Sequence, residues 1–332
     1  MTPSGEPTTN GGRTMRAALL DGFGDASALR IGTAPAPTPV LSEVLVRVMA
    51  AGVNPLDTST RAGDGAAAGI GGFPAVLGSD FSGVVVAAPY ESFELQPGDE
   101  VYGVSSAPRG SGSVAELVAV PPHHLALKPK VLTHAEAAAV PLAALTAWGA
   151  VVELAHAHAG QRILVHAGAG GVGHFAVQLA AYFGATVVAT TSAVNEAWVR
   201  SLGADEVVDY HERRFEEAMR PVDAVIDLVG DRHDHVGPRS LAVLRPGGLL
   251  VTLPSTGWPT LAADAAAAGV RATKYRMVPD SATLAVITRL LTSGDLKVAV
   301  QEEFPFDRIA DAQRLLESGH VRGKVVVRIS DY

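Results

Sequence analysis

The sequence predicts an α/β protein of two domains, one rich in β-strands and one built on a doubly wound parallel sheet. Three observations support this fold class. The chain has 332 residues, which is long for one compact core. Short β-type runs separated by Gly and Pro turns fill the part from Met15 to about Lys130. From Thr133 onward strand-like and helix-like segments alternate, as they do in parallel sheets covered on both faces.

The first domain is expected to be a small β-barrel-like fold. Residues 1–14 are rich in Pro, Ser, Thr and Gly and lack the apolar core of a signal peptide, so we expect a disordered leader. The proline-rich segment Pro35–Pro39 cannot be a central strand, because proline lacks the ladder donor. The predicted strands of this domain are Val44–Val48, Gly83–Ala87, Glu100–Val104 and Val114–Val120.

The second domain is expected to begin with a capped helix. Thr133 is followed by Glu136 in capping-box position and then by Ala137–Ala150, a stretch with few helix breakers. Val325–Val327 near the end should pair back into the first domain. We therefore assign residues 15–132 and 279–332 to the first domain and 133–278 to the second. The predicted strands of the second domain are Arg162–His166, Thr186–Ala189, Glu206–Val208, Ala224–Leu228 and Leu249–Leu253, with helices at Gly171–Phe183, Glu196–Leu202 and Pro238–Leu244. A further helix is predicted over Ser281–Ser293, in the segment assigned to the first domain.

The composition excludes several classes of function. The formal net charge is −8 and the Lys and Arg residues are scattered, whereas nucleic acids and anionic membranes require clustered positive charge. The absence of cysteine excludes disulfides, thiolate nucleophiles and Cys-ligated zinc. No uninterrupted apolar run reaches the length of a membrane span. We expect a cytoplasmic protein that binds a small molecule and neither nucleic acid nor membrane.

The strongest motif is the run Gly168-Ala169-Gly170-Gly171-Val172-Gly173. It follows the predicted strand Ile163–His166 and opens the helix His174–Phe183, which is the context that a dinucleotide fingerprint requires. Glycines let the backbone approach a pyrophosphate, whose charge then lies at the helix N-terminus. The second domain is therefore predicted to be a Rossmann domain that binds a dinucleotide through Gly168, Gly170, Gly171, Val172 and Gly173.

The end of the second strand favours NADPH over NADH. In an NAD site this strand ends in an acidic residue that holds the ribose hydroxyls. Here the strand ends in Thr191 and Ser192, with no acid before Glu196. Small hydroxyls leave room for a 2′-phosphate, and Arg200 and Tyr210 are candidates to complete its pocket. A solvated helix face is the alternative position for Arg200.

Several further motifs follow one another along the chain. They are Ala50–Asp57, Pro74–Gly83, Gly98–Val101, Leu145–Trp148, the Gly168 fingerprint, Leu202–Asp205 and Gly323-Lys324. With these motifs in this order and spacing, the chain from Met15 onward resembles the quinone oxidoreductase branch of the medium-chain dehydrogenase/reductase superfamily.

The resemblance implies a GroES-like substrate domain, a cleft between it and the Rossmann domain, and a homodimer formed by adding one Rossmann sheet edge, near Thr273–Val278, to another. It also implies that Thr146 lies near the nicotinamide, and we assign Val229 and Lys324 to the cofactor site.

The resemblance also predicts a site without zinc. Zinc-dependent relatives supply Cys, His and Glu around the first two motifs, whereas this chain has Asn54 in place of the Cys and Ser79-Asp80 in place of the His-Glu pair. Without a metal to lower a hydroxyl pKa, oxidation of simple alcohols is disfavoured. Asn54 is the predicted catalytic residue, a polar group at the nicotinamide. Asp57 and Arg61, four residues apart, are predicted to form a helical ion pair.

The predicted activity is NADPH-dependent reduction of a quinone or an α,β-unsaturated carbonyl. Such a reaction requires mainly hydrogen-bond donors aimed at the oxygen on which charge develops. An enoyl-thioester reductase and a non-catalytic NADPH-binding protein are the alternatives. Similar quinone reductases carry tyrosines after the Asn-Pro motif, but Thr58–Ile70 contains no aromatic residue. We therefore expect a wide pocket and hypothesise a bulky polycyclic substrate.

Overall fold

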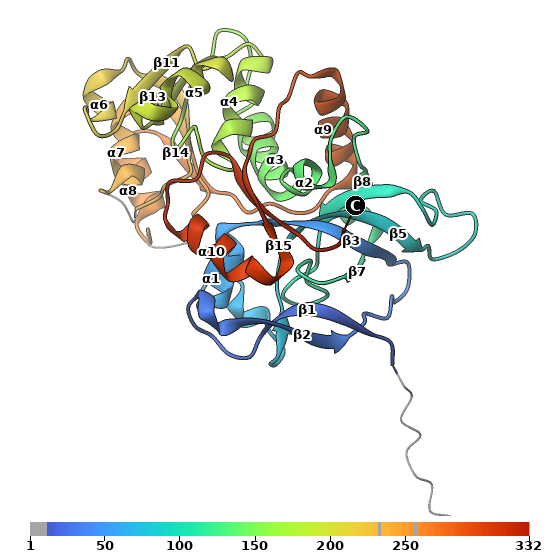
Figure 1. Ribbon diagram of the computed structural model, residues 1–332. Coiled ribbons are helices and arrows are strands. Elements are labelled where there is room, and N and C mark those ends of the chain that lie inside the picture. Colours follow the sequence, from blue (N-terminus) through green and yellow to red (C-terminus); the bar gives the residue numbers. More distant parts are fainter. Residues whose placement is uncertain (1–11, 232–233, 255–257, 332) are drawn as a thin grey trace, which may run out of the picture.

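The first domain contains a seven-stranded sheet and a smaller three-stranded sheet (Figure 1). A computed structural model describes residues 12–231, 234–254 and 258–331. Residues 1–11 of the predicted leader lie outside this part, and Thr14 already belongs to β1. The large sheet has the order β15-β16-β3-β5-β6-β8 with β7 paired to β3, and the small one β2-β1-β4. The strands are β1 Thr14–Leu20, β2 Leu29–Pro35, β3 Val44–Val53, β4 Ala75–Val76, β5 Asp80–Ala87, β6 Glu100–Val104, β7 Leu117–Val120, β8 Leu125–Leu127, β15 Val300–Pro305 and β16 Lys324–Arg328.

Two predictions for this domain are confirmed. The strand predicted over Glu100–Val104 is β6, with the same bounds. β16 pairs antiparallel with β3, which places Val326 opposite Gly52 and returns the end of the chain to the first domain. The predicted strand Val114–Val120 is shorter, because β7 begins at Leu117.

The second domain is built on a six-stranded sheet in which every pair of neighbouring strands is parallel. Its order, β11-β10-β9-β12-β13-β14, confirms the predicted doubly wound sheet. β10 and β11 lie on one side of β9, and β12, β13 and β14 lie on the other, so the strand order reverses next to β9. Ligands of such sheets bind at the carboxyl ends of the strands at this point. The strands are β9 Arg162–Val165, β10 Thr186–Thr191, β11 Glu206–Asp209, β12 Val222–Asp227, β13 Leu244–Thr252 and β14 Arg271–Lys274; the helices are α4 Gly173–Tyr182, α5 Glu196–Ser201, α6 Phe215–Ala218, α7 Val236–Ser240 and α8 Leu261–Ala267.

The helical segment that enters the second domain is broken where a continuous helix was predicted. The capping box is confirmed, since Thr133 Oγ1 accepts from the Glu136 amide at 3.2 Å and α2 covers His134–Ala138. The prediction of one helix over Ala137–Ala150 is wrong. Pro141 has no N–H to donate, so it starts a new helix, α3 Pro141–Trp148, which continues as a π-helical turn over Gly149–Leu154.

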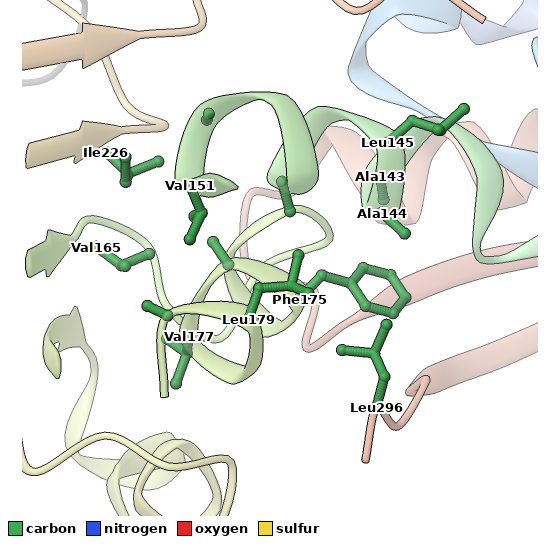
Figure 2. Packing of buried hydrophobic residues seen from close by; sticks show 14 of the residues in the cluster. Ala143, Ala144, Leu145, Val151, Val165, Phe175, Val177, Leu179, Ile226 and Leu296 are labelled. Atoms are coloured by element: carbon green, nitrogen blue, oxygen red, sulfur yellow. The ribbon is translucent and has the colours of Figure 1, made fainter. Parts of the chain in front are cut away.

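The main core joins the two domains. Figure 2 shows Phe175 and Leu179 of α4 in one cluster with Ala144 of α3 and with Leu296. Phe175 and Leu179 are fully buried, and each contributes roughly 1.5–3 kcal/mol by its removal from water. No helix among the described residues is long and apolar enough to cross a membrane.

Two helices follow the Rossmann sheet in the sequence and pack on different surfaces. α9, Ser281–Ser293, contributes Leu284 and Ile287 to the main core, and the Tyr102 hydroxyl of β6 donates to its Leu284 carbonyl at 3.1 Å. α10, Ile309–Glu317, packs on the core of the first domain. Because α9 contacts both domains, the domain boundaries stay a prediction.

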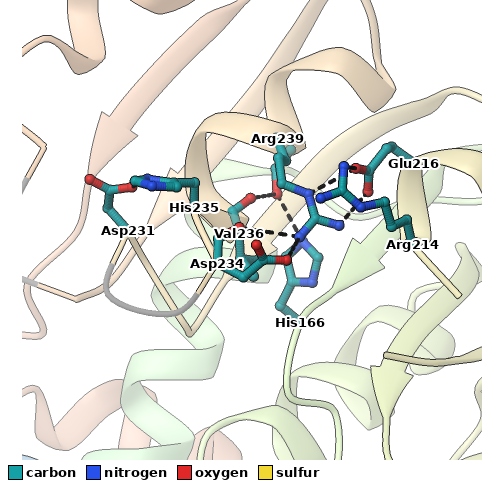
Figure 3. A network of polar contacts seen from close by, with 9 residues as sticks. His166, Arg214, Glu216, Asp231, Asp234, His235, Val236 and Arg239 are labelled. Atoms are coloured by element: carbon teal, nitrogen blue, oxygen red, sulfur yellow. Dashed lines mark hydrogen bonds and ion pairs between the residues drawn. The ribbon is translucent and has the colours of Figure 1, made fainter. Parts of the chain in front are cut away.

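A polar cluster lies at the carboxyl ends of the Rossmann strands (Figure 3). Arg239 of α7 forms ion pairs with Glu216, at 2.7 Å, and with Asp234, and its guanidinium lies 4.8 Å from the centre of the Phe215 ring. His166, directly before the fingerprint loop, is within 2.9 Å of Ser240 Oγ of the same helix. α7 is thereby fixed over the loop that follows β9.

Two buried histidines should make the fold sensitive to acid. Burial lowers the pKa of His166 and of His174 to about 4, below the usual value of roughly 6.5. Both are neutral in the folded protein, so below pH ~6.5 the unfolded chain binds protons that the folded one does not. We expect these two histidines to lower the free energy of unfolding, measured in urea titrations, by about 4 kcal/mol between pH 7 and pH 5. Asp57, whose pKa burial raises to about 6, acts in the opposite direction and offsets about 1 kcal/mol of this fall. The variant His174→Gln should lose about half of this dependence, whereas an unchanged pH profile would contradict the assignment.

Candidate functional site

The fingerprint loop is shaped to receive an anion. The loop runs from the end of β9 to Gly173, the first residue of α4, and the Gly168 amide donates to the Thr190 carbonyl at 2.9 Å. A Cβ at Gly173 would lie 2.0 Å from the Ala167 carbonyl oxygen, so this glycine permits close packing of helix against loop. A Cβ at Gly170 would meet only that oxygen, at 3.2 Å, and would otherwise fill open space. The backbone at Gly170 can therefore approach a pyrophosphate at the N-terminus of α4.

A buried lysine connects this loop to the first domain. Lys324 lies one residue after Gly323, whose amide donates to the Ala169 carbonyl at 2.8 Å. Its side chain passes so close to Gly171 that a Cβ there would lie 3.2 Å from Lys324 Cδ. Its ammonium group bonds Asn54 Oδ1 and lies 3.1 Å from Asp80 Oδ2. The Lys324 and Asp80 side chains are only 4% and 0% exposed, so the pair is shielded from solvent.

Asn54, the predicted catalytic residue, lies at the centre of this cluster. It precedes α1, Pro55–Arg61, as the N-cap residue. Its Nδ2 donates to Asp80 Oδ2 at 2.9 Å and its Oδ1 accepts from Lys324. Because both polar atoms are engaged and the residue is 2% exposed, Asn54 holds the cluster together in this geometry. Direct contact of Asn54 with a substrate stays a prediction.

Asp57 and Arg61 face in different directions, so the predicted ion pair between them is wrong. Asp57 accepts from the Asn54 amide at 2.9 Å and from Ser79 Oγ at 2.7 Å. Arg61 is buried and donates to Gln313 Oε1, at 3.0 Å, and to Glu317, both on α10. The i,i+4 spacing allowed an ion pair, but both side chains instead form hydrogen bonds with residues of distant segments.

Asp57 and Ser79 line a small cavity in the first domain. Its volume is ≈ 10 Å³. Burial raises the pKa of Asp57 to about 6; the neighbouring Asp80 carboxylate acts in the same direction, and the Ser79, Asn54 and Lys324 contacts oppose it. The other lining residues are Leu56, Thr60, Ala66, Leu77, Gly78, Ala107 and Pro108.

An aromatic pair lies beside α1, although Thr58–Ile70 contains none. Phe23 and Phe73 meet edge to face with their ring centroids 5.1 Å apart, and a Cβ at Gly63 would lie 3.4 Å from Phe23. Both rings are about half exposed. The expectation of a wide pocket considered only Thr58–Ile70, whereas these two rings come from segments on either side of that stretch. The polycyclic substrate stays a hypothesis.

The residues predicted for the adenosine end of the cofactor are brought together with one exception. Thr191 ends β10, and the Tyr210 amide donates to its carbonyl at 3.4 Å. Ser192 Oγ accepts from Asn195 Nδ2 at 3.3 Å. The neighbouring strand adds a carboxylate that the sequence argument overlooked, because Asp209 Oδ2 accepts from the Ala193 amide at 3.0 Å. The hydrogen bond from the His211 amide, with that from Ala193, keeps the pKa of Asp209 below its usual value.

Arg200 is the exception, and its predicted place in the phosphate pocket is corrected. Its Nε donates to Glu196 Oε1 and its Nη1 to the Asp205 carbonyl, both at 2.9 Å. The Asp205 amide bonds the carbonyl of Val187, near the start of β10. The guanidinium is therefore directed toward the amino end of the strand, whereas Thr191 lies at its carboxyl end.

Arg322 is a cation near the fingerprint that sequence reasoning missed. Its guanidinium carbon lies 5.2 Å from the centre of the Trp198 ring on α5, and its amide donates to Gln301 Oε1 at 2.6 Å. It is exposed, and it has no ion pair in the part of the chain that the structure describes. Its position in the run Arg322-Gly323-Lys324, beside the motif residues, was the available signal.

The remaining predicted residues lie around the same edge of the sheet. Thr146 is buried, and its hydroxyl donates to the Leu142 carbonyl, one helical turn earlier in α3, at 2.6 Å. The amide of the same Leu142 donates to Asp80 Oδ1 at 2.7 Å. Val229 follows β12, with its amide on Asp227 Oδ1 at 3.0 Å. These contacts place Val229 at the carboxyl end of β12 and the α3 turn that carries Thr146 beside Asp80 of the Lys324 cluster.

The side chains at the Lys324 cluster do not fit a zinc ion. Among the described residues, no three His, Asp or Glu side chains are grouped closely enough to hold a metal. Asp80 Oδ2 is shared by Asn54 and Lys324, and Oδ1 accepts from the Leu142 amide. A second cation would have to displace the lysine ammonium from this carboxylate. The zinc-free site stays a prediction that rests on the residues at positions 54 and 79.

Comparisons with known proteins agree with this arrangement. Residues 41–130 match the family described as alcohol dehydrogenase GroES-like domain, and residues 202–327 match the family described as zinc-binding dehydrogenase. The chain is 34% identical to the mitochondrial NAD(P)H oxidoreductase RTN4IP1 of Danio rerio, over 96% of this chain and 92% of that protein. It is 36% identical to 2-methylene-furan-3-one reductase of Solanum lycopersicum, over 94% and 79% of the two chains.

Further relatives extend these similarities to structure. The NADPH-dependent alkenal/one oxidoreductase of Arabidopsis thaliana, named as chloroplastic, is 35% identical over 95% of this chain and 80% of its own. The solved structure of the quinone oxidoreductase from Coxiella burnetii superimposes with a TM-score of 0.90 at 35% identity, and covers 96% of this chain and 100% of its own.

Proposed function

Because the chain belongs to the quinone oxidoreductase branch of the medium-chain dehydrogenase/reductase superfamily, we propose that it is an NADPH-dependent reductase of quinones or α,β-unsaturated carbonyls. The observation that carries the proposal is the contact between the open fingerprint loop and the Lys324 cluster. This contact supports the proposal because a glycine loop with open space at Gly170 and a buried cation meet at one junction of the two domains. The names of the relatives, which include alkenal/one and quinone oxidoreductases, support this substrate class.

The residues of this chain bind the cofactor and stabilise the charge that develops on the acceptor. NADPH, when bound, supplies the hydride. The amides around Gly170 and the N-terminus of α4 hold its pyrophosphate, and Val229 after β12 and Thr146 on α3 are the neighbours proposed for the nicotinamide. The Lys324 ammonium adds positive charge to this buried region, where charge develops on the oxygen of the acceptor. Asn54 and Asp80 fix the position of that ammonium.

A turnover assay tests this function. Oxidation of NADPH, followed by its absorbance, should be measured with p-benzoquinone, methyl vinyl ketone and crotonyl-CoA as acceptors. We expect turnover with the quinone or the enone. Preference for crotonyl-CoA would favour the alternative of an enoyl-thioester reductase. Tight NADPH binding without turnover on any acceptor would favour a non-catalytic binding protein and overturn the proposal.

Arg322 rather than Arg200 is expected to contribute to cofactor affinity. Arg322→Ala removes an exposed cation beside the fingerprint loop that forms no ion pair within the described part of the chain, and we expect the NADPH dissociation constant to rise roughly tenfold, or about 1.4 kcal/mol. Arg200→Ala, the matched control, removes a guanidinium bonded to Glu196 and Asp205 and should leave the constant within about twofold. Fluorescence titration with NADPH measures both, and a larger effect of Arg200→Ala would reverse the assignment.

We also propose that the protein is cytoplasmic and forms a homodimer through the edge of the Rossmann sheet. The edge strand is β14, Arg271–Lys274, and this corrects the predicted range Thr273–Val278. Cell fractionation tests the location, because two relatives are named as mitochondrial and chloroplastic. Sedimentation velocity should give twice the chain mass of 34.2 kDa.

A further inference from the structure

We propose that Ser79 and Asp57 form a relay that supplies the proton needed to complete the reduction. In this relay the Ser79 hydroxyl protonates the oxygen of the reduced acceptor, and Asp57 returns a proton to Ser79. The inference rests on the proposed function and adds to it a source of protons inside the protein. It starts from a contact that the binding of the cofactor does not use, the hydrogen bond of 2.7 Å between Ser79 Oγ and Asp57 Oδ1.

The two groups are placed where an acceptor oxygen could reach them. Both line the cavity of ≈ 10 Å³, which is room for about one oxygen atom or one water molecule. Among the other lining side chains, Leu56, Leu77 and Pro108 are apolar, and the one further hydroxyl, that of Thr60, already accepts from the Ala66 amide at 3.2 Å. A polar oxygen that enters such a cavity finds hydrogen-bonding partners mainly at the Ser79–Asp57 pair.

The pair is also joined to the cofactor loop by an unbroken series of contacts. Asp57 Oδ2 accepts from the Asn54 amide, the Asn54 side chain binds Lys324, and Lys324 packs against Gly171 of the fingerprint. The cavity therefore lies on the substrate-domain side of the cluster that touches the fingerprint loop. This is the side from which an acceptor would meet a bound nicotinamide.

The environment of Asp57 suits it to hold and release a proton near neutral pH. Asp57 is 5% exposed, and burial raises its pKa to about 6. The charged groups that face it are Asp80, which raises the pKa further, and Lys324, which lowers it. Arg61, on the same helix, is turned away toward α10. A general acid is most effective when its pKa lies near the working pH.

The proton transfer balances without any other reactant. Addition of hydride to carbon leaves a negative oxygen on the acceptor. The O–H bond of Ser79 breaks as a new O–H bond forms on the acceptor, and the proton of protonated Asp57 passes to Ser79 Oγ. Asp57 is left as a carboxylate that accepts the Ser79 hydrogen bond, as seen in the structure, and it takes its next proton from solvent.

The pH dependence of kcat tests the relay, with NADPH and p-benzoquinone or methyl vinyl ketone as the probes. Asp57 must be protonated to donate, so wild-type kcat should be highest below the pKa of about 6 and fall about tenfold per pH unit above it. Ser79→Ala and Asp57→Asn should lower kcat at the low-pH plateau by at least about tenfold and flatten the profile. The NADPH dissociation constant should stay within about twofold in both variants.

Two controls separate the relay from a structural role. Asp57 also accepts from the Asn54 amide at the start of α1, so Asp57→Asn can disturb the helix, whereas Ser79→Ala leaves that contact in place. Ser79→Thr keeps the hydroxyl and should restore kcat and the pH dependence. Ser105→Ala removes a neighbouring buried hydroxyl that donates to the Gly78 carbonyl at 2.6 Å, and the pH dependence should persist.

The outcomes distinguish the relay from the function on which it rests. If the wild type reduces neither acceptor, the proposed function fails and the relay fails with it. If the wild type is active but Ser79→Ala keeps its kcat and its pH dependence, the relay is wrong and the function stands. A flat wild-type profile would also exclude Asp57 as the donor.

Discussion

The variant Gly170→Val is expected to fold and to lose NADPH binding. A side chain at residue 170 would fill the open space above the loop, where the backbone must approach the pyrophosphate. The nearest described atom to its Cβ is the Ala167 carbonyl oxygen at 3.2 Å, a contact that a small shift relieves. We expect the NADPH dissociation constant to rise at least about a hundredfold, a loss of ~3 kcal/mol, in a fluorescence titration.

Gly173→Ala is the matched control for this variant. Its added Cβ would lie 2.0 Å from the Ala167 carbonyl oxygen and 2.9 Å from the Gly168 Cα, both of them backbone atoms. We therefore expect Gly173→Ala to lower the thermal stability of the fold, whereas Gly170→Val should melt near the wild-type temperature. Wild-type affinity in Gly170→Val would place the pyrophosphate elsewhere.

The variant Lys324→Met should be among the most destabilising single changes. It removes the ammonium group from a pair whose side chains are 4% and 0% exposed and leaves the Asp80 carboxylate without its cation. Loss of one member of a buried pair costs about 3–5 kcal/mol, because the remaining charge is not solvated. We expect this decrease in the free energy of unfolding from urea titrations, together with weaker NADPH binding.

A double-mutant cycle checks the physical reason for that loss. In Asp80→Asn/Lys324→Met no uncompensated charge remains, so the double variant should be more stable than Lys324→Met alone. Additive effects of the two substitutions would show that Lys324 and Asp80 do not stabilise each other. If Lys324→Met lowered the free energy of unfolding by less than about 1 kcal/mol, this would argue against the buried pair.

The local sequence was sufficient wherever the determining interactions are short in range. The Thr133–Glu136 capping box, the glycine run after a buried strand and the alternation of strands with helices each involve neighbours along the chain, and all three are confirmed. The break at Pro141 also had a local cause, since proline lacks an amide donor, and the helix predicted over Ala137–Ala150 did not take this into account.

Side-chain partners, in contrast, were decided by the tertiary structure. Asp57 and Arg61 could have paired on their helix, but the fold brings Ser79 to the first and Gln313 and Glu317 to the second. Arg200 lies near the predicted phosphate pocket in the sequence, yet Glu196 and Asp205 direct it to the other end of β10.

Local patterns were therefore enough to predict the fold class, the family and the glycine loop between β9 and α4. Which charges meet depends on the tertiary structure, because Lys324 reaches Asn54 and Asp80 only when β16 pairs with β3. A strand or a helix cap is stabilised by groups a few residues apart, so its pattern is visible in the sequence. A buried ion pair depends on the packing of segments more than two hundred residues apart, and no local pattern records that packing.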